Sequence, residues 1–220
     1  VIIGAGYIGL EAAAVARQMG LEVTVLEMAD RVLARVTSPT MSAFYEKEHR
    51  AQGATILTGA RLDHLEGENG KVSAAVLADG TKLPADMVLV GIGILPNVEL
   101  AEEAGLTIDN GVATDRDART SDPRIFAAGD CASRPLVHYG HSGQYDLKLQ
   151  IAGLNQGHDE IVVRGNPDDR KFAVFYLRNG TLIAVDAVNS PPEFLASKKL
   201  IMMGSKVAPD MLKDTYTSMK

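Results

Sequence analysis

Three glycines near the start of the chain have the spacing of a dinucleotide-binding turn. Residues 4–9 follow the apolar run 1–3 and read Gly-Ala-Gly-Tyr-Ile-Gly. In such a turn the first glycine permits the tight change of direction, the second lets the backbone approach a pyrophosphate, and the third lets the next helix lie close to the sheet. The phosphates meet the N–H groups at the start of that helix. The residues predicted to form this site are Gly4, Gly6, Tyr7, Ile8 and Gly9.

An acidic residue follows the next predicted strand. A helix over residues 10–19 ends at Gly20, and a strand over residues 22–26 leads into Glu27. Glu27 lies 23 residues after Gly4, where a carboxylate accepts hydrogen bonds from the adenosine ribose. That carboxylate would repel the 2′-phosphate of NADP, so Glu27 favours NAD. The strand, helix and strand around the motif disfavour the alternative, a glycine-rich turn in another kind of α/β protein.

The elements that follow complete a mononucleotide-binding half. The spacing of apolar residues predicts a helix over residues 40–52, stopped by Gly53, and a strand over residues 54–57. Three strand-like segments come next, separated by Asn69-Gly70 and Asp79-Gly80, and both dipeptides suit tight hairpin turns. These segments are residues 61–67, 72–78 and 82–83. We therefore expect a β-meander in place of a crossover helix.

Two further predicted strands end in glycine-containing segments. A buried strand over residues 86–92 runs into Gly91 and Gly93, and glycines at the carboxyl end of a strand suit the close approach of a ligand. A turn that needs glycine explains the same residues equally well. A strand over residues 125–128 ends in Gly129-Asp130, where the aspartate can bond a sugar-like hydroxyl or cap a helix. The chemistry of the residues leaves both roles open.

The remainder of the chain predicts a small α+β domain. Residues 133–143 contain Pro135, Gly140 and Gly143 without a helical pattern. A helix is expected to follow Pro191-Pro192. The strands predicted before that helix cover residues 147–152, 160–164, 172–177 and 181–188.

The composition argues against several classes of protein. The net charge is −6 over 220 residues, which argues against general nucleic-acid binding. No apolar run reaches the ~18 to 20 residues that span a bilayer, and the chain starts with a strand instead of a signal peptide, so we expect a cytoplasmic protein that does not act on membranes. The one cysteine, Cys131, excludes a disulfide framework within these residues. We expect no metal site, because the histidines lack metal-ligand spacing: His49, His64, His138, His141 and His158.

Several of these segments occur in the order and spacing of a known superfamily. The opening motif, Gly-Ile-Gly-Ile-Leu-Pro-Asn (91–97) and Thr-Ser-Asp-Pro-Arg-Ile-Phe-Ala-Ala-Gly-Asp (120–130) resemble two-dinucleotide flavoprotein reductases. The closing part resembles the NADH-dependent ferredoxin reductases that serve ring-hydroxylating dioxygenases and bacterial cytochromes P450. That likeness is carried by Gln-Tyr-Asp-Leu-Lys-Leu-Gln-Ile-Ala-Gly (144–153), Phe-Tyr-Leu-Arg-Asn-Gly (175–180) and Phe-Leu-Ala-Ser-Lys-Lys-Leu-Ile (194–201). The resemblance covers nearly the whole chain.

The resemblance implies an FAD enzyme in which NADH delivers a hydride to the flavin and electrons pass singly to a [2Fe-2S] ferredoxin. It places Glu11 near the nicotinamide carboxamide, and Gly91 and Gly93 along the same pocket. It places Asp130, preceded by Gly129, on the ribityl chain of FAD. No acid or base is assigned, because the cofactors carry the redox step. Glu11 is equally compatible with a solvated carboxylate in the first turn of a helix.

The resemblance also implies three domains, of which the FAD-binding one is incomplete. They are an NAD(H)-binding domain over residues 1–97, the C-terminal half of an FAD-binding domain over residues 98–143, and a C-terminal reductase domain over residues 144–220. The family's FAD domain begins with its own glycine-rich motif, whereas this chain has one such motif in all. The family also runs a long helix after the Gly-Asp segment, whereas residues 133–143 show no helical pattern and resemble a junction at which sequence is missing. We therefore expect an incomplete chain that retains FAD poorly.

Two other functions stay open on the sequence. The chain could be an NAD(H)-binding module without catalytic activity, and flavin content would distinguish this case. It could also be a relative of the FAD-dependent disulfide reductases or NADH peroxidases, which share the first half. The closing domain disfavours the latter, because disulfide reductases carry a longer dimerisation domain with a His-Glu pair.

Overall fold

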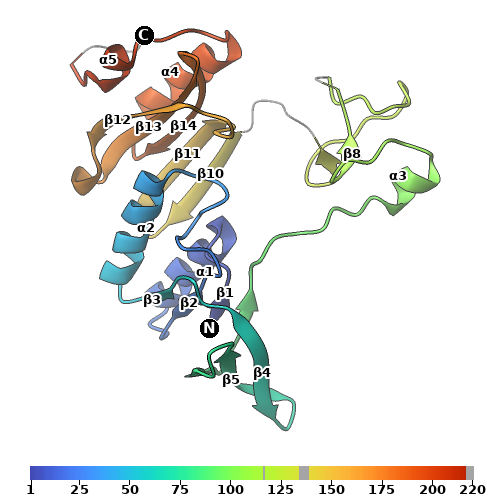
Figure 1. The fold of residues 1–220 in the computed structure, drawn as a ribbon, viewed down its shortest axis with the longest axis vertical. Helices are drawn as coiled ribbons and strands as arrows, with labels where there is room; N and C mark the ends of the chain where they lie inside the picture. Colours follow the sequence, from blue (N-terminus) through green and yellow to red (C-terminus); the bar gives the residue numbers. More distant parts are fainter. Residues whose placement is uncertain (116, 134–138, 217–220) are drawn as a thin grey trace. The chain divides into compact units, whose positions relative to one another are not determined.

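The first strand of the chain lies inside a parallel sheet of four strands (Figure 1). β1 (Ile2–Ile3) pairs with β2 (Thr24–Leu26) on one side and with β7 (Leu89–Val90) on the other, and β2 also pairs with β3 (Thr55–Leu57). The order is β3-β2-β1-β7, and every pair is parallel. This is the βαβαβ arrangement of a mononucleotide-binding half, and it confirms the predicted α/β fold.

The contacts within the chain divide it into two units. The computed structural model describes residues 1–115, 117–133 and 139–216. The first unit consists of Val1–Ile92 together with Tyr139–Lys220, and the second consists of Gly93–His138. The parallel sheet and the last five strands of the chain both belong to the first unit.

Two helices pack against the parallel sheet. α1 (Tyr7–Gln18) starts directly after the glycine turn. α2 (Pro39–Ala51) starts after Ser38, whose hydroxyl accepts a hydrogen bond from the Met41 N–H at 3.4 Å. A serine at this position satisfies a helix-start donor, and proline is tolerated at the first helical residue because its missing N–H needs no partner there. Both helices lie close to their predicted positions.

The predicted β-meander forms a separate antiparallel sheet. β4 (Leu62–Glu68), β5 (Lys71–Leu77) and β6 (Lys82–Pro84) pair in the order β4-β5-β6. Asn69 and Gly70 join the first two strands with φ angles of 53° and 77°. Both angles are positive, as a tight hairpin turn requires, so the prediction from this dipeptide is confirmed.

The strand predicted over residues 86–92 is shorter and more exposed than expected. Only β7 is in strand conformation, and Val90 and Ile92 are 60% and 62% exposed. The apolar composition predicted burial, but β7 stands at the edge of the sheet. A strand is buried only where another layer covers it, and composition does not reveal whether the described residues supply that layer.

The C-terminal part of the first unit is a five-stranded antiparallel sheet. Its order is β10-β11-β14-β13-β12, and four of its strands confirm the predicted ones. Its strands are β10 (Tyr139–Gln144), β11 (Leu147–Gly153), β12 (Glu160–Asn166), β13 (Lys171–Arg178) and β14 (Thr181–Val188), with a 3₁₀ turn, η1 (Pro167–Asp169), between β12 and β13.

The fifth strand, β10, overlaps the segment 133–143, for which the sequence predicted no helix or strand. Tyr145 has a φ of 59°, and the turn at this residue folds β10 back onto β11, where Gly140 and Gly143 take part in the pairing. Backbone pairing requires no apolar pattern, and an edge strand tolerates glycine. Pro135 lies outside the described residues.

The C-terminal sheet is covered on both faces. Phe172, Val174 and Tyr176 of β13 belong to the core cluster shared with α1 and α2, whereas Phe175 and Leu177 belong to a second cluster. This alternation follows from the two-residue period of a strand. The second cluster is completed by side chains from α4 (Pro191–Met202) and α5 (Pro209–Lys213).

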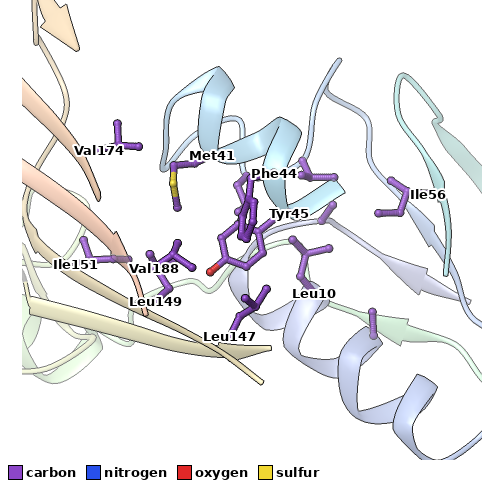
Figure 2. Close-up of a cluster of buried hydrophobic side chains, with 14 of the residues drawn as sticks. Leu10, Met41, Phe44, Tyr45, Ile56, Leu147, Leu149, Ile151, Val174 and Val188 are labelled. Carbon is purple, nitrogen blue, oxygen red and sulfur yellow. The ribbon is translucent and has the colours of Figure 1, made fainter. Parts of the chain in front are cut away.

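The first face of the C-terminal sheet packs directly on the nucleotide-binding half. Figure 2 shows Tyr45 of α2 between Leu10 of α1 and the strand residues Leu149 and Val188. All four side chains are fully buried. The mononucleotide-binding half and the C-terminal domain therefore share one hydrophobic core.

The second unit contains α3 (Glu99–Glu103) and the parallel strand pair β8 (Val112–Ala113) and β9 (Ala132–Ser133). The prediction of a strand over residues 125–128 is wrong. Phe126 makes an isolated bridge with Arg119 and is 59% exposed. An apolar run becomes a strand only when a neighbouring strand pairs along its length, and the described residues of this unit supply a single bridge there.

Candidate functional site

The carboxyl ends of three parallel strands meet at the glycine turn. β1 runs into Gly4, β2 into Glu27 and β7 into Gly91. Open parallel sheets bind ligands at this edge. The structure thus brings together eight of the eleven predicted site residues: Gly4, Gly6, Tyr7, Ile8, Gly9, Glu11, Glu27 and Gly91.

Two glycines of the turn are required by backbone crowding. Gly4 has a φ of 100°, and a Cβ built on it would lie 2.4 Å from the carbonyl oxygen of Gly91. A Cβ on Gly9 would lie 2.0 Å from the carbonyl oxygen of Gly4. Real Cβ atoms do not approach backbone oxygen so closely, so these positions accept only glycine without a shift of the backbone. They hold α1 close against β1 and β7.

Gly6 differs from Gly4 and Gly9 because a side chain at Gly6 would meet open space. Its φ is −77°, and a Cβ built on it has no heavy atom within 4 Å among the described residues. Gly6 is the N-cap of α1, and its carbonyl oxygen accepts the Leu10 N–H at 3.0 Å. The N–H groups of Tyr7, Ile8 and Gly9 therefore precede the first intrahelical bond and remain available at the end of the helix. Open space beside such N–H groups fits a pyrophosphate.

Glu27 is held by the backbone on both sides. One carboxylate oxygen accepts the Ala5 N–H and the other accepts the Ala29 N–H, each at 2.8 Å. These bonds fix the carboxylate beside the glycine turn. An ionised carboxylate has about four acceptor positions, so two remain for the hydroxyls of a ribose. The half-buried side chain can bind a sugar without changing its present partners.

Leu33 also holds the glycine turn, and nothing in the sequence pattern identified it. Its N–H donates to the carbonyl oxygen of Ala5 at 2.9 Å. Leu33 is 2% exposed and has a φ of 55°, which is uncommon for a residue with a side chain. Both backbone groups of Ala5 are therefore taken, one by Glu27 and one by Leu33. Leucine, unlike glycine or asparagine, does not indicate a positive φ, so the role of Leu33 could not be predicted from the sequence.

Tyr7 and Glu11 lie one helical turn apart on α1, and both are half-buried. The hydroxyl oxygen of Tyr7 is buried and has no hydrogen-bond partner among the described residues. Burial raises the pKa of the Tyr7 hydroxyl, and the carboxylate of Asp186 adds to this shift. Tyr7 therefore stays neutral over the whole physiological range. Ile8, between the turn and Glu11, is 64% exposed.

The remaining three predicted residues belong to the other unit. Gly93, Gly129 and Asp130 are exposed, and the two glycines have φ angles of 118° and 79°. Neither glycine has a heavy atom within 4 Å of a built Cβ among the described residues. A ligand could approach the backbone of either residue closely.

Neither a metal site nor a membrane-spanning helix is present in the described part of the chain. No group of three His, Cys, Asp or Glu side chains within residues 1–115, 117–133 and 139–216 is arranged to hold a metal ion. Over the same ranges, no helix has the length and apolar character needed to cross a membrane. His138, one of the five histidines considered above, lies outside the described residues.

Two protein-family models match the chain. The family described as pyridine nucleotide-disulphide oxidoreductase matches residues 1–154. The family described as reductase C-terminal matches residues 140–220, which contain the antiparallel sheet from β10 to β14 except Tyr139, together with α4 and α5.

The relatives with similar sequences are named as reductases. The chain is 40% identical over 257 positions to putidaredoxin reductase from Pseudomonas putida. It is 39% identical over 256 positions to the ferredoxin reductase subunit of 5,5'-dehydrodivanillate O-demethylase from Sphingobium sp.. The chain also resembles the solved covalent putidaredoxin reductase–putidaredoxin complex, with a TM-score of 0.92 and 40% identity over 99% of this chain and 61% of that chain. These names agree with the resemblance carried by the sequence motifs.

The chain spans less than two thirds of these relatives. Each of the two sequence matches covers 100% of this chain, but only 61% of putidaredoxin reductase and 62% of the Sphingobium subunit. The first alignment has 257 positions for a chain of 220 residues, so at least 37 aligned positions have no residue here.

Proposed function

Because the chain belongs to the pyridine nucleotide-disulphide oxidoreductase family, we propose that it is part of an FAD enzyme that passes electrons from NADH to a [2Fe-2S] ferredoxin. The observation that carries this proposal is the presence in one compact unit of a glycine turn open at Gly6 and a reductase C-terminal domain. The partner is inferred from putidaredoxin reductase, which is found in a covalent complex with putidaredoxin.

We assign NAD(H) to the glycine turn. The N–H groups of Tyr7, Ile8 and Gly9 would bind the pyrophosphate, since the space beside Gly6 is open. Glu27 would accept hydrogen bonds from the adenosine ribose and would exclude the 2′-phosphate of NADP. Glu11 would face the nicotinamide carboxamide, and Gly91 and Gly93 would line the same pocket. These roles require binding and orientation, not proton transfer, so no residue is assigned as an acid or base.

We assign FAD to a site that this chain supplies only in part. FAD supplies the step from a two-electron hydride donor to a one-electron acceptor. Gly129 and Asp130 are exposed, with room beside the glycine, and would hold the ribityl chain. The chain contains one Gly-x-Gly-x-x-Gly motif, so the motif for the flavin pyrophosphate would come from the part of the relatives that this chain does not span.

We propose three functional parts within the chain. They are an NAD(H)-binding domain over residues 1–97, part of an FAD-binding domain over residues 98–143 and a reductase domain over residues 144–220. We also propose a cytoplasmic location, where NADH is the available donor and thiols stay reduced, which suits a chain with one cysteine. The relatives' role in oxygenase systems, such as the O-demethylase subunit, suggests that the electrons serve the catabolism of aromatic compounds.

A second function, an NAD(H)-binding module without redox activity, is favoured by one observation. The chain holds a complete glycine turn but only Gly129 and Asp130 of the proposed flavin site. A disulfide reductase is less well supported, because the match of residues 140–220 is to a reductase C-terminal family.

The proposal is tested first by titrating the purified chain with NADH and following the increase in nicotinamide fluorescence. We expect saturable binding of NADH in preference to NADPH. Glu27→Arg should raise the Kd for NADH at least about tenfold, because the ribose loses a charge-assisted hydrogen bond. Glu22→Arg introduces the same change of charge at an exposed position before β2 and should leave binding unchanged. Equal Kd values for the two variants would remove the assignment of Glu27.

The flavin part of the proposal is tested by the visible spectrum. The chain is incubated with FAD and free flavin is removed, and we expect a colourless protein that still binds NADH. A retained flavin that bleaches with NADH would show that residues 1–220 complete the flavin site and would contradict the partial-site assignment. Electron transfer itself is measured on the natural full-length protein as NADH-dependent bleaching of a [2Fe-2S] ferredoxin. No ferredoxin reduction by that protein would leave the binding module as the function.

A further inference from the structure

The segment between Glu27 and α2, residues 28–38, is shaped by its own hydrogen bonds. The guanidinium group of Arg31 donates to the carbonyl oxygens of Ala34 and Thr37 at 2.9 and 3.1 Å, and to the hydroxyl of Ser42 at 2.6 Å. The Thr37 N–H donates to the carbonyl oxygen of Leu33 at 3.1 Å. Because Leu33 also binds Ala5, a displacement of Thr37 would be transmitted to the glycine turn through few bonds.

The far end of this segment is held by a buried carboxylate of the C-terminal sheet. The hydroxyls of Thr37 and Tyr176 each donate to Oδ2 of Asp186 at 2.5 Å. The Ser38 N–H donates to the Tyr176 hydroxyl at 3.2 Å. Thr37 and Asp186 are 5% and 2% exposed, and Tyr176 is fully buried. Thr37 is therefore fixed to the C-terminal domain by a partner 149 residues later in the chain.

A carboxylate is a costly residue for this position. Asp186 lies on β14 between Ala184 and Val188, both in the core shared with the nucleotide-binding half. Its pairing partners across the sheet are Ile151 and Val174. Taking an ionised carboxylate out of water costs several kcal/mol, and an apolar residue would fill such a site at lower cost. The bonds to Thr37 and Tyr176 are the specific gain that the carboxylate provides.

We propose that Asp186 is a positioning residue for the NAD(H) site. Through Thr37 it fixes the segment 28–38, and that segment holds Ala5 and the backbone around Glu27 in the geometry that binds the nucleotide. Nucleotide affinity then depends on a carboxylate of the C-terminal domain that touches no part of the nucleotide. This inference rests on the proposed function, because it requires NAD(H) to bind at the glycine turn.

Among the described residues, three tyrosines interact with the carboxylate of Asp186: Tyr7 of α1, Tyr45 of α2 and Tyr176 of β13. The ring of His158 packs on the ring of Tyr176, with centroids 5.2 Å apart. Burial raises the pKa of all three tyrosines, so they stay neutral below pH 10. Burial also raises the pKa of Asp186 to about 6, against the opposing effect of the hydrogen bonds from Thr37 and Tyr176. Asp186 is therefore the group of this set whose pKa burial moves toward neutral pH.

The link is tested by removing one hydroxyl. Thr37→Val keeps the shape of the side chain but loses the bond to Asp186, and we expect the Kd for NADH at pH 8 to rise about tenfold, as for the loss of a hydrogen bond to a charged group. Thr37→Ser keeps the hydroxyl and should restore native affinity. Tyr145→Phe is the matched control, because it removes a hydroxyl that contacts His49 of α2 at 3.1 Å without touching residues 28–38. Its affinity should be native.

A pH profile separates positioning from general loosening. Adenosine diphosphate ribose is stable in acid and shares the pyrophosphate and ribose of NADH, so its Kd is measured by calorimetry from pH 5 to pH 8. A protonated carboxyl accepts hydrogen bonds more weakly, so the native Kd should rise several-fold as the pH falls through about 6. Asp186→Asn should abolish this dependence. A slope that survives in Asp186→Asn would overturn the proposal.

The outcomes distinguish this inference from the function on which it rests. A native chain that binds neither NADH nor adenosine diphosphate ribose refutes the proposed function. A native chain that binds both, with a folded Thr37→Val variant of unchanged affinity, refutes only the positioning role of Asp186. Folding of each variant is verified by its circular dichroism and melting temperature.

Discussion

At the scale of single residues, the glycine turn meets two separate demands. Gly4 and Gly9 are required by contacts within the protein, because a side chain at either position would collide with backbone oxygen. Gly6 meets no such collision, and its φ of −77° is open to any residue. We propose that the need for glycine at this position comes from a ligand that approaches the backbone. This separation allows folding and binding to be tested one at a time.

The prediction at this scale compares two alanine substitutions. Gly6→Ala should cost less than about 1 kcal/mol of stability, since the only loss is a less favourable N-cap. It should nevertheless abolish detectable NADH binding, because the methyl group occupies the place of the pyrophosphate. Gly9→Ala should destabilise the protein by about 3 kcal/mol or more, because the backbone of the turn must shift. Thermal melts and NADH titration of both variants check this, and NADH binding by Gly6→Ala would show that the pyrophosphate lies elsewhere.

At the scale of elements, strand β14 contacts two neighbours because alternate residues face opposite sides of the sheet. Val185 and Ala187 lie in the cluster formed with α4 and α5, whereas Ala184 and Val188 lie in the core shared with α1 and α2. The parity of Ala184 and Val188 also turns Asp186 toward the nucleotide-binding half. A charged side chain in an apolar strand is thus placed where it meets the hydroxyl of Thr37.

The prediction at the element scale concerns the stability of Asp186→Asn. The pKa of Asp186 is about 6 in the folded protein and close to 3.8 in the unfolded chain. The folded state therefore binds this proton more tightly, so ionisation of Asp186 lowers stability as the pH rises from about 4 to about 6. Above that window the penalty is constant, at about 3 kcal/mol for a shift of about 2 pKa units.

Asparagine carries no such charge and can still accept the two hydroxyl hydrogen bonds. Asp186→Asn should therefore be more stable than the native chain at pH 8, with a smaller advantage at pH 5. Urea unfolding at the two pH values measures the difference. An advantage that grows toward acid would show that the carboxylate is stabilised in the folded state, contrary to the cause assigned here. The variant is thus expected to gain stability while losing the pH dependence of nucleotide affinity.

At the scale of the whole first unit, the nucleotide-binding half and the C-terminal domain are not independent. The ring of Phe44 packs edge-on against Tyr45 and Phe172, with centroids 5.2 and 4.9 Å apart. Phe172 belongs to β13, and Phe44 and Tyr45 of α2 are both buried in the shared core. Figure 2 shows α2 between the two halves at this point. Such a continuous core favours a single cooperative transition.

The prediction at this scale is that the two halves unfold together. Phe44→Ala should cost about 3 to 5 kcal/mol and should accelerate hydrogen exchange in β1–β3 and in β11–β14 alike. Leu212→Ala removes a fully buried side chain from the second cluster and should accelerate exchange mainly in α5 and β12, which pack together. Mass spectrometry of peptide fragments reports the exchange. Acceleration by Phe44→Ala in the parallel sheet alone would show that the C-terminal domain folds independently.

The sequence by itself determined the features that depend on neighbouring residues. The spacing of Gly4, Gly6 and Gly9 identified the turn, because tight turns and helix starts are decided within a few residues. Asn69-Gly70 identified a hairpin for the same reason. The order of strands and helices then followed, and with it the parallel sheet and the position of Glu27 beside the turn.

Only the tertiary structure decided which surfaces meet. It showed that residues 139–144 form a strand, because pairing with β11 compensates for a segment with no apolar pattern. It showed that Val90 is exposed, because no layer of the described residues covers the edge of the sheet there. It also brought Thr37 to Asp186 across 149 residues. Burial and long-range hydrogen bonds depend on the packing of distant elements, and a pattern read along the chain contains no record of that packing.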